Sequence, residues 1–167
     1  MIEVRVDDLA FFQGAALVRP VNAELGATTP LLRRLEVAAG PALANQLRIQ
    51  EPMPVGSAVV TAAGDLEVEL IVHAVVCSKT EPVSRDSVRR AFTSALQRSV
   101  DWQLDNVGVA PFGLGAGNLD IEESAEIMAE VVARHLTRAR FPARICFVAE
   151  SAEEERALTV ALQRTGV

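Results

Sequence analysis

The sequence predicts an α/β domain with a mixed, largely parallel sheet that carries helices on both faces. From residue 68 onward, strand-sized apolar runs alternate regularly with segments of helical periodicity, which is typical of parallel strands joined through helices. The first two extended runs have no helix between them, and this favours a mixed sheet. A chain of 167 residues, half of them apolar, is expected to form a single domain over residues 1–167 with a core of its own.

Each element has a local signal in the sequence. Residues 2–6 alternate apolar and charged side chains as a half-buried strand does. Residues 15–21 form a second extended run, in which Pro20 indicates an edge or a strand end. Thr29 and Pro30 are expected to be the N-cap and the first residue of a helix. The remaining strands are expected at 57–61, 68–77, 107–110 and 144–149, and the remaining helices at 42–47, 84–104, 120–136 and from 151 onward.

Composition and charge exclude several classes of function. The formal net charge of −6 argues against a nucleic-acid binder, which usually presents a basic surface. Charges interrupt the first eight residues, so we expect no signal peptide, and no apolar run is long enough to span a membrane. A cytoplasmic location is the default expectation. Cys77 and Cys146 lie in apolar runs without a ligand partner nearby, which predicts buried free thiols, no metal site and no cofactor.

A glycine-rich turn follows the predicted strand 107–110 directly and precedes a helix. It reads Phe112-Gly113-Leu114-Gly115-Ala116-Gly117-Asn118. Alternating glycines leave the backbone bare and allow dihedral angles that other residues avoid. Successive N–H groups can then point into one concavity and hold an anion, such as a phosphate. A purely structural strand-to-helix turn explains the same glycines.

Three carboxylates limit where a phosphate could sit. Asp120, Glu122 and Glu123 occupy the start of the following helix, where they satisfy its dipole and repel an anion. A bound phosphate is therefore expected on the loop amides of Gly113 to Gly117. No lysine follows the glycines as in a P-loop, and the spacing does not match a dinucleotide-binding turn.

Other polar residues have weaker signals. His73 lies inside an apolar strand and is expected to be a hydrogen-bonded core residue. His135 lies near a helix end, where it suits the dipole. The pair Asp7-Asp8 and Asn22 follow strands; they are turn residues or, alternatively, groups that contact a ligand.

Taken in order, these motifs resemble those of the macro domain, an ADP-ribose-binding module. The similarity spans nearly the whole chain. Asp7-Asp8-Leu9 is similar to the family's Asp-Ile-Thr, and Val21-Asn22-Ala23 to the start of Val-Asn-Ala-Ala-Asn. Residues 35–43, 54–66 and 71–75 resemble the first helix, the Gly-x-Ala-x-x-Thr-x-Gly-x-Leu stretch and the Ile-His-Ala-Val strand, and residues 110–117 resemble the second phosphate loop.

The resemblance implies a three-layer α/β/α fold with a mixed six-stranded sheet and a ligand cleft at the strand ends. It implies that Asp8 and the Leu9 amide contact adenine. Asn22 is a further candidate ligand-binding residue, which would orient the ribose if the protein were a hydrolase. The turn is assigned to the diphosphate, with Phe112 supporting it or lining the far ribose. The ligand-binding residues of this turn are Phe112, Gly113, Leu114, Gly115, Ala116, Gly117 and Asn118.

This chain departs from the family pattern in its first loop. Residues 24–29 are short and contain one glycine, and the second asparagine of the motif is replaced near Glu24 or Leu25. The Gly-Gly-x-Asp element of hydrolysing members is absent. We therefore expect a module that binds ADP-ribose or a related nucleotide without catalysis. The alternatives are a macro-like scaffold for protein interaction or homodimerisation, and a hydrolase of ADP-ribosylated groups.

Overall fold

The computed structural model describes residues 1–167. It contains a six-stranded sheet in the order β1-β6-β5-β2-β4-β3, in which only β3 runs antiparallel to its neighbour. The strands are β1 Ile2–Val6, β2 Ala16–Asn22, β3 Ala58–Ala62, β4 Leu70–Cys77, β5 Asn106–Val109 and β6 Arg144–Ala149. The helices are α1 Pro30–Ala39, α2 Pro41–Gln46, α3 Arg85–Asp101, α4 Ile121–Leu136 and α5 Ala152–Thr165, with a short 3-10 helix, η1, at Leu9–Phe11.

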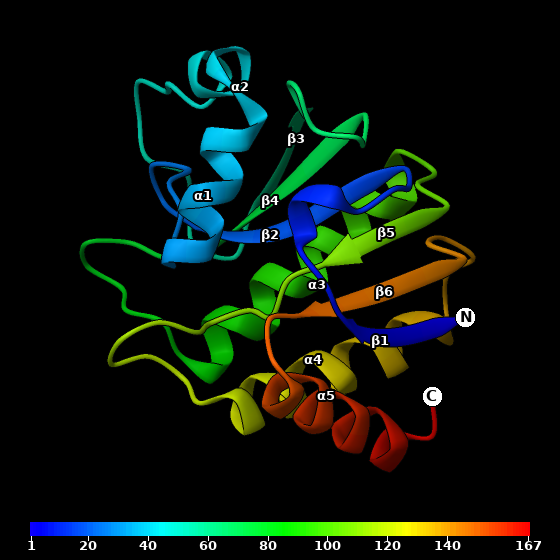
Figure 1. The fold of residues 1–167 in the computed structure, drawn as a ribbon. Coiled ribbons are helices and arrows are strands. Elements are labelled where there is room, and N and C mark those ends of the chain that lie inside the picture. The colour runs from blue at the N-terminus through cyan, green and yellow to red at the C-terminus, as the bar shows by residue number, and fades with distance from the viewer.

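Helices cover the two faces of the sheet unequally (Figure 1). The larger core lies between the sheet and α3, α4 and α5, and its largest aromatic side chains are Phe92, Phe112 and Phe147. A smaller core lies on the other face, where η1, α1 and α2 pack. The predicted α/β class with a mixed sheet is confirmed, and the layers are those of an α/β/α sandwich.

Four helices begin directly after a capping residue, as the sequence predicted for Thr29. Thr29, Ser84, Asp120 and Ser151 each accept a hydrogen bond from a backbone N–H in the first turn of the helix that follows. Such caps satisfy donors that have no partner within the helix. All the predicted strands and helices are present, and their observed ends differ from the predicted ends by a few residues. The 3-10 helix was not predicted, because its signal is only Asp8, whose carboxylate accepts from the Ala10 amide over 2.9 Å.

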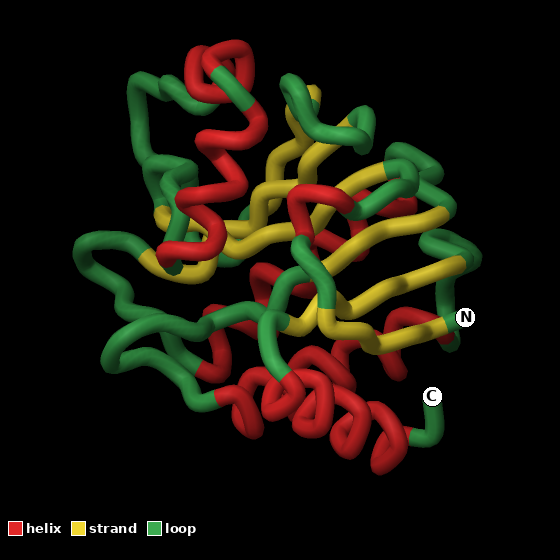
Figure 2. The backbone as a smooth tube through the Cα atoms, viewed as in Figure 1, coloured by secondary structure: helices red, strands yellow, loops and turns green.

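The carboxyl ends of the five parallel strands lie at one edge of the sheet, where the loops that follow β2, β4 and β5 gather (Figure 2). The segments that follow β1 and β2 pass to the face of the sheet that carries η1 and α1. The segments that follow β4, β5 and β6 pass to the opposite face. Neighbouring connections therefore diverge at three places, β1/β6, β5/β2 and β2/β4. Crevices for ligands form where adjacent connections diverge in this way.

No helix combines the length and the apolar character that crossing a membrane would require.

Candidate functional site

The glycine turn after β5 presents a row of unpaired backbone donors. Gly113, Gly115 and Gly117 all have positive φ angles, of 81°, 128° and 77°. The amides of residues 113–117 donate to no acceptor within the chain, whereas those of Asn118 and Leu119 close the turn on Gly115 and Gly113 carbonyls. Five consecutive free N–H groups are the feature that an anion-binding turn requires.

Packing and hydrogen bonds with buried side chains fix the position of this turn. Phe112 is fully buried and packs on Phe92 with ring centroids 5.1 Å apart. Its amide donates to the Met128 sulfur over 3.2 Å, and its carbonyl accepts from the Ser124 hydroxyl. A Cβ at Gly113 would lie 2.6 Å from Val88 Cγ2, so only glycine fits there. Of the two roles expected for Phe112, the structure supports that of a foundation for the turn.

The N-terminus of α4 is already occupied by the chain's own carboxylate. Asp120 accepts from the Glu123 amide over 2.8 Å, and Glu122 and Glu123 lie in the first turn. These negative charges disfavour an anion on the helix itself. That a phosphate binds to the loop amides instead of the helix stays a prediction.

The loop after β2, residues 23–29, lies beside the glycine turn. Asn22 Oδ1 accepts from the amides of Glu24 and Gly26, over 3.0 and 2.9 Å, and so folds the loop back on the end of the strand. The carbonyl oxygen of Thr28 lies 3.2 Å from the position of a Cβ at Gly115. The Thr28 hydroxyl is buried and has no hydrogen-bond partner. The short loop thus lies close to the glycine turn at Thr28, a residue whose hydroxyl has no partner.

A buried arginine fixes this loop from inside. Arg19, on β2, is fully buried, and it donates to His73 Nδ1 over 2.9 Å and to the Leu25 carbonyl over 3.1 Å. It also donates to Glu36 of α1 over 2.6 Å. Leu25 has a φ of 65°, a left-handed conformation that its hydrogen bond to Arg19 helps to maintain. Arg19 was not predicted as part of the site, because its only signal in the sequence is one charge within an apolar strand.

Burial and hydrogen bonding fix the protonation state of this network. Because Arg19 donates to Nδ1 of His73, the ring proton lies on Nε2, which is 2.8 Å from the Thr61 hydroxyl. Burial first, and the Arg19 charge second, lower the pKa of His73 well below its usual value. Burial also lowers the pKa of Arg19, although Glu36 opposes this change. The expectation of a hydrogen-bonded core histidine is confirmed.

Asp8 and Leu9 lie at the same sheet edge but across β6 from the glycine turn. Asp8 is exposed, with one carboxylate oxygen committed to Ala10, and the Leu9 amide donates to no atom of the chain. Arg34 of α1 and Glu150, which follows β6, approach to 3.9 Å. The β1/β6 crevice therefore offers one free acceptor and one free donor side by side.

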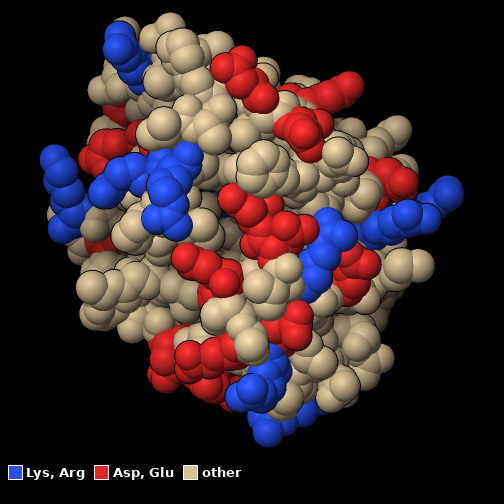
Figure 3. All heavy atoms as spheres, viewed as in Figure 1, with Lys and Arg blue, Asp and Glu red and all other residues tan.

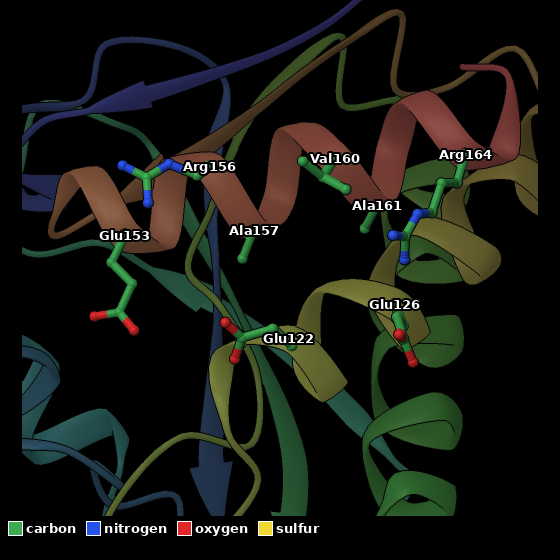
Figure 4. A pocket seen from close by; sticks show the side chains of 8 residues that line it. All are labelled: Glu122, Glu126, Glu153, Arg156, Ala157, Val160, Ala161 and Arg164. Atoms are coloured by element: carbon green, nitrogen blue, oxygen red, sulfur yellow. The ribbon is translucent and has the colours of Figure 1, made fainter.

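A cavity of about 530 Å³ lies between α4 and α5, away from the glycine turn (Figure 4). Its lining mixes the carboxylates of Glu122 and Glu153 with the guanidinium groups of Arg156 and Arg164. Glu153 and Arg164 point from α5 toward α4, whereas Arg156 lies along α5. No set of histidine, cysteine or carboxylate side chains is arranged to hold a metal ion. On the face shown in Figure 3, basic side chains lie in small groups among acidic ones and form no continuous basic stripe.

Comparison with known proteins agrees with this geometry. The family model described as Macro domain matches residues 18–128. An uncharacterised protein of Mycobacterium tuberculosis is 25% identical over 162 residues, which are 97% of this chain and 45% of that protein. This chain therefore spans about half the length of the first relatives that it matches. A Klebsiella pneumoniae protein named O-acetyl-ADP-ribose deacetylase is 28% identical, with 87% of each chain covered.

The fold has solved counterparts. A mutant macrodomain of Oceanobacillus iheyensis, solved with ADPR, superposes with a TM-score of 0.87 at 19% identity, over 98% of this chain and 92% of the other. At this identity the similarity establishes the fold. The α/β/α layering and the mixed six-stranded sheet are those of this structural family.

Proposed function

Because the chain belongs to the macro domain family, we propose that it binds ADP-ribose or a related nucleoside diphosphate along the carboxyl edge of its sheet. The observation that carries the proposal is the row of five free amides at residues 113–117, beside the loop that carries the buried, unpaired hydroxyl of Thr28. Free N–H donors suit the several acceptor oxygens of a diphosphate.

The remaining predicted residues extend the site in both directions. Asp8 and the Leu9 amide supply an acceptor and a donor, which match the exocyclic amine and a ring nitrogen of adenine. Asn22 uses its oxygen within the loop, but its Nδ2 donates to no atom of the chain. That amide nitrogen is therefore available to a sugar hydroxyl. Macrodomains of Oceanobacillus iheyensis and Trypanosoma brucei have been solved with ADP, which supports a ligand of this class.

We assign binding rather than catalysis to the site. Nδ1 of His73, on the central strand β4, already accepts from Arg19, and its Nε2 carries the ring proton beside the Thr61 hydroxyl. The buried ring therefore has no free lone pair with which to act as a general base. The relative named O-acetyl-ADP-ribose deacetylase makes hydrolysis the second candidate. Incubation with O-acetyl-ADP-ribose tests it directly; we expect no acetate above the uncatalysed rate.

Isothermal titration with ADP-ribose and ADP tests the proposal. We expect both nucleotides to bind, and Gly115→Glu to abolish binding, because its carboxylate would enter the crevice beside Thr28. Gly166→Glu is the control, since Gly166 also has a positive φ, of 79°, but lies at the end of α5. Absence of heat with the folded protein at millimolar nucleotide would overturn the proposal and favour the scaffold alternative.

A further inference from the structure

The strand β1 lies at one edge of the sheet and pairs only with β6, to which it runs parallel (Figure 1). At one end of this ladder the Met1 carbonyl accepts from the Ile145 amide over 3.0 Å. At the other end the Asp7 amide donates to the Ala149 carbonyl over 3.1 Å. Because successive residues of a strand direct their backbone groups to alternate sides, the odd-numbered residues of β1 bond to β6 and the even-numbered residues point outward.

The outward backbone groups of β1 belong to Ile2, Val4 and Val6, and nothing in the chain hydrogen-bonds to them. The opposite edge of the sheet is treated differently, since the outward amide of Ala62 on β3 donates to Gln46 Oε1 of α2 over 3.3 Å. An uncapped edge strand is a template on which another strand can add. The backbone of β1 is therefore open to a strand from a second chain.

The side chains of β1 are self-complementary about Val4. Ile2 and Val4 pack on the larger core, and Val6, on the same face of the strand, is 47% exposed. Glu3 and Arg5 flank Val4 on the other face and form an ion pair of 3.3 Å that is about half exposed. A second β1, antiparallel to the first and centred on Val4, would place an opposite charge across from each of these two residues. Such cross-strand pairs stabilise a sheet.

The same register satisfies the backbone. Two residues that both direct their N–H and C=O groups outward can form a hydrogen-bonded pair of an antiparallel ladder, in which both bonds are exchanged. Val4 and the partner's Val4 would form one such pair, and Ile2 and the partner's Val6 another. Glu3 and the partner's Arg5 would then form a non-hydrogen-bonded pair, in which side chains lie closest. Hydrogen bonding and charge thus select one register.

The helix beside β1 leaves room for a second copy. α5 packs on both β1 and β6, so it lies inward of the edge. With strands about 4.8 Å apart, the α5 helices of two copies joined at β1 would lie about 10 Å apart, which is an ordinary distance between packed helices. A groove of about 260 Å³ lies between β1 and α5. The residues that α5 contributes to this groove are uncharged: Thr159, Leu162, Gln163 and Val167.

We propose that two copies of this chain associate through β1, antiparallel and centred on Val4, so that their six-stranded sheets become continuous. A contact in which the same surface of each copy meets the other closes after two copies. Because the two β1 strands run in opposite directions, the carboxyl edges of the two sheets would face opposite ways, with one candidate nucleotide site on each. The association goes beyond nucleotide binding and does not depend on it.

Sedimentation equilibrium between about 10 µM and 1 mM protein tests whether the chain associates. The mass of one chain is 17.9 kDa. We expect the average mass to rise with concentration toward that of a dimer, with a dissociation constant of about 10 µM, as a small interface gives. A mass that stays at 17.9 kDa throughout would overturn the proposal and leave the edge to a strand of a different protein.

Two charge substitutions test the register. Glu3→Arg would place two guanidinium groups opposite each other, and Arg5→Glu two carboxylates, so each variant alone should associate at least about tenfold more weakly. An equimolar mixture of the two should regain the association of the wild type, because opposite charges again face each other at both positions. Glu51→Arg, the same exchange at an exposed position outside the sheet, is the control and should associate like the wild type.

Circular dichroism verifies that both charge variants fold. If the wild type forms dimers but the mixture of folded variants does not regain them, the contact lies elsewhere and the proposal is wrong.

Amide hydrogen exchange followed by nuclear magnetic resonance locates the contact. The amides of Val4 and Val6 gain acceptors in the dimer, so their exchange should slow at least about threefold between about 50 µM and 1 mM protein. The amide of Val60 is the matched control, because it points outward from the opposite edge strand on the same side as that of Ala62. Slower exchange at Val60 in place of Val4 would move the contact to β3 and overturn the proposal.

Discussion

Arg19 donates its Nε–H to Nδ1 of His73 across 2.9 Å, between the two neighbouring central strands β2 and β4. The same guanidinium binds Glu36 of α1 and the carbonyl of Leu25 in the loop that faces the glycine turn. One buried cation thereby joins the sheet, the helix that covers it and one wall of the candidate site. Such a buried network stabilises the fold only if each of its polar groups has a hydrogen-bond partner.

Replacement of Arg19 tests that role. Arg19→Lys keeps the charge but cannot reach His73, Glu36 and Leu25 together, so it leaves buried polar groups unpaired. We expect the free energy of unfolding, measured in urea, to fall by about 3 kcal/mol. Arg33→Lys, the same exchange at an exposed position of α1, should change it by less than about 0.5 kcal/mol. A loss below about 1 kcal/mol in Arg19→Lys would show that the network contributes little.

His73 makes stability depend on pH in a defined direction. Its pKa in the folded protein is well below the usual value near 6.5, so between these two values the unfolded chain binds a proton that the folded chain does not. The free energy of unfolding should therefore fall by about 1.4 kcal/mol for each pH unit below 6.5. The loss continues until the pH reaches the folded pKa.

The measurement is a series of urea titrations between pH 8 and pH 5, approximately the range in which only histidine side chains change charge. His73→Gln, whose side-chain oxygen can still accept from Arg19, should flatten the profile by that slope. His135→Gln serves as the matched control and should retain the slope. Parallel profiles for wild type and His73→Gln would contradict the assignment of a neutral, buried imidazole.

Local signals in the sequence account for most of the fold. The cap at Thr29 and the apolar strand expected at 68–77 each depend on residues within a few positions. The structure confirms the cap and contains the strand over Leu70–Cys77. The approach of Thr28 to Gly115 and the pairing of Arg19 with His73 join distant parts of the chain. No periodicity or spacing encodes such contacts, so the shape of the second wall and its buried anchor were not predictable.

The Thr28 hydroxyl offers a prediction in which stability and binding change in opposite directions. It is buried without a partner in the free protein, and an unsatisfied buried hydroxyl costs about 1–3 kcal/mol. Thr28→Val keeps the shape of the side chain and removes the hydroxyl. We expect it to stabilise the free protein by about 1 kcal/mol and to weaken ADP binding, because a donor to the diphosphate is lost.

The neighbouring threonine is the natural comparison for Thr28. Thr29 Oγ1 accepts from the Leu32 amide over 3.3 Å at the start of α1, so Thr29→Val should destabilise the protein by about 1 kcal/mol. Thermal unfolding and calorimetry with ADP measure both effects. If Thr28→Val also destabilises the protein, its hydroxyl is satisfied in solution and is not held ready for a ligand.

Gly117 and Gly166 form a matched pair for testing the glycine turn. Their φ angles are 77° and 79°, and a Cβ built at either would meet no atom within 4 Å. Alanine should therefore cost each site about the same, about 1–2 kcal/mol for the left-handed backbone. Gly117 supplies one of the five free amides, whereas Gly166 ends α5. Alanine keeps the backbone N–H, but its Cβ would enter the open space beside the free amides. If a phosphate binds there, Gly117→Ala should weaken ADP binding by about tenfold, while Gly166→Ala should not. Equal effects of the two substitutions on ADP affinity would mean that the turn acts only as a tight connection between β5 and α4, and that its free amides hold no phosphate.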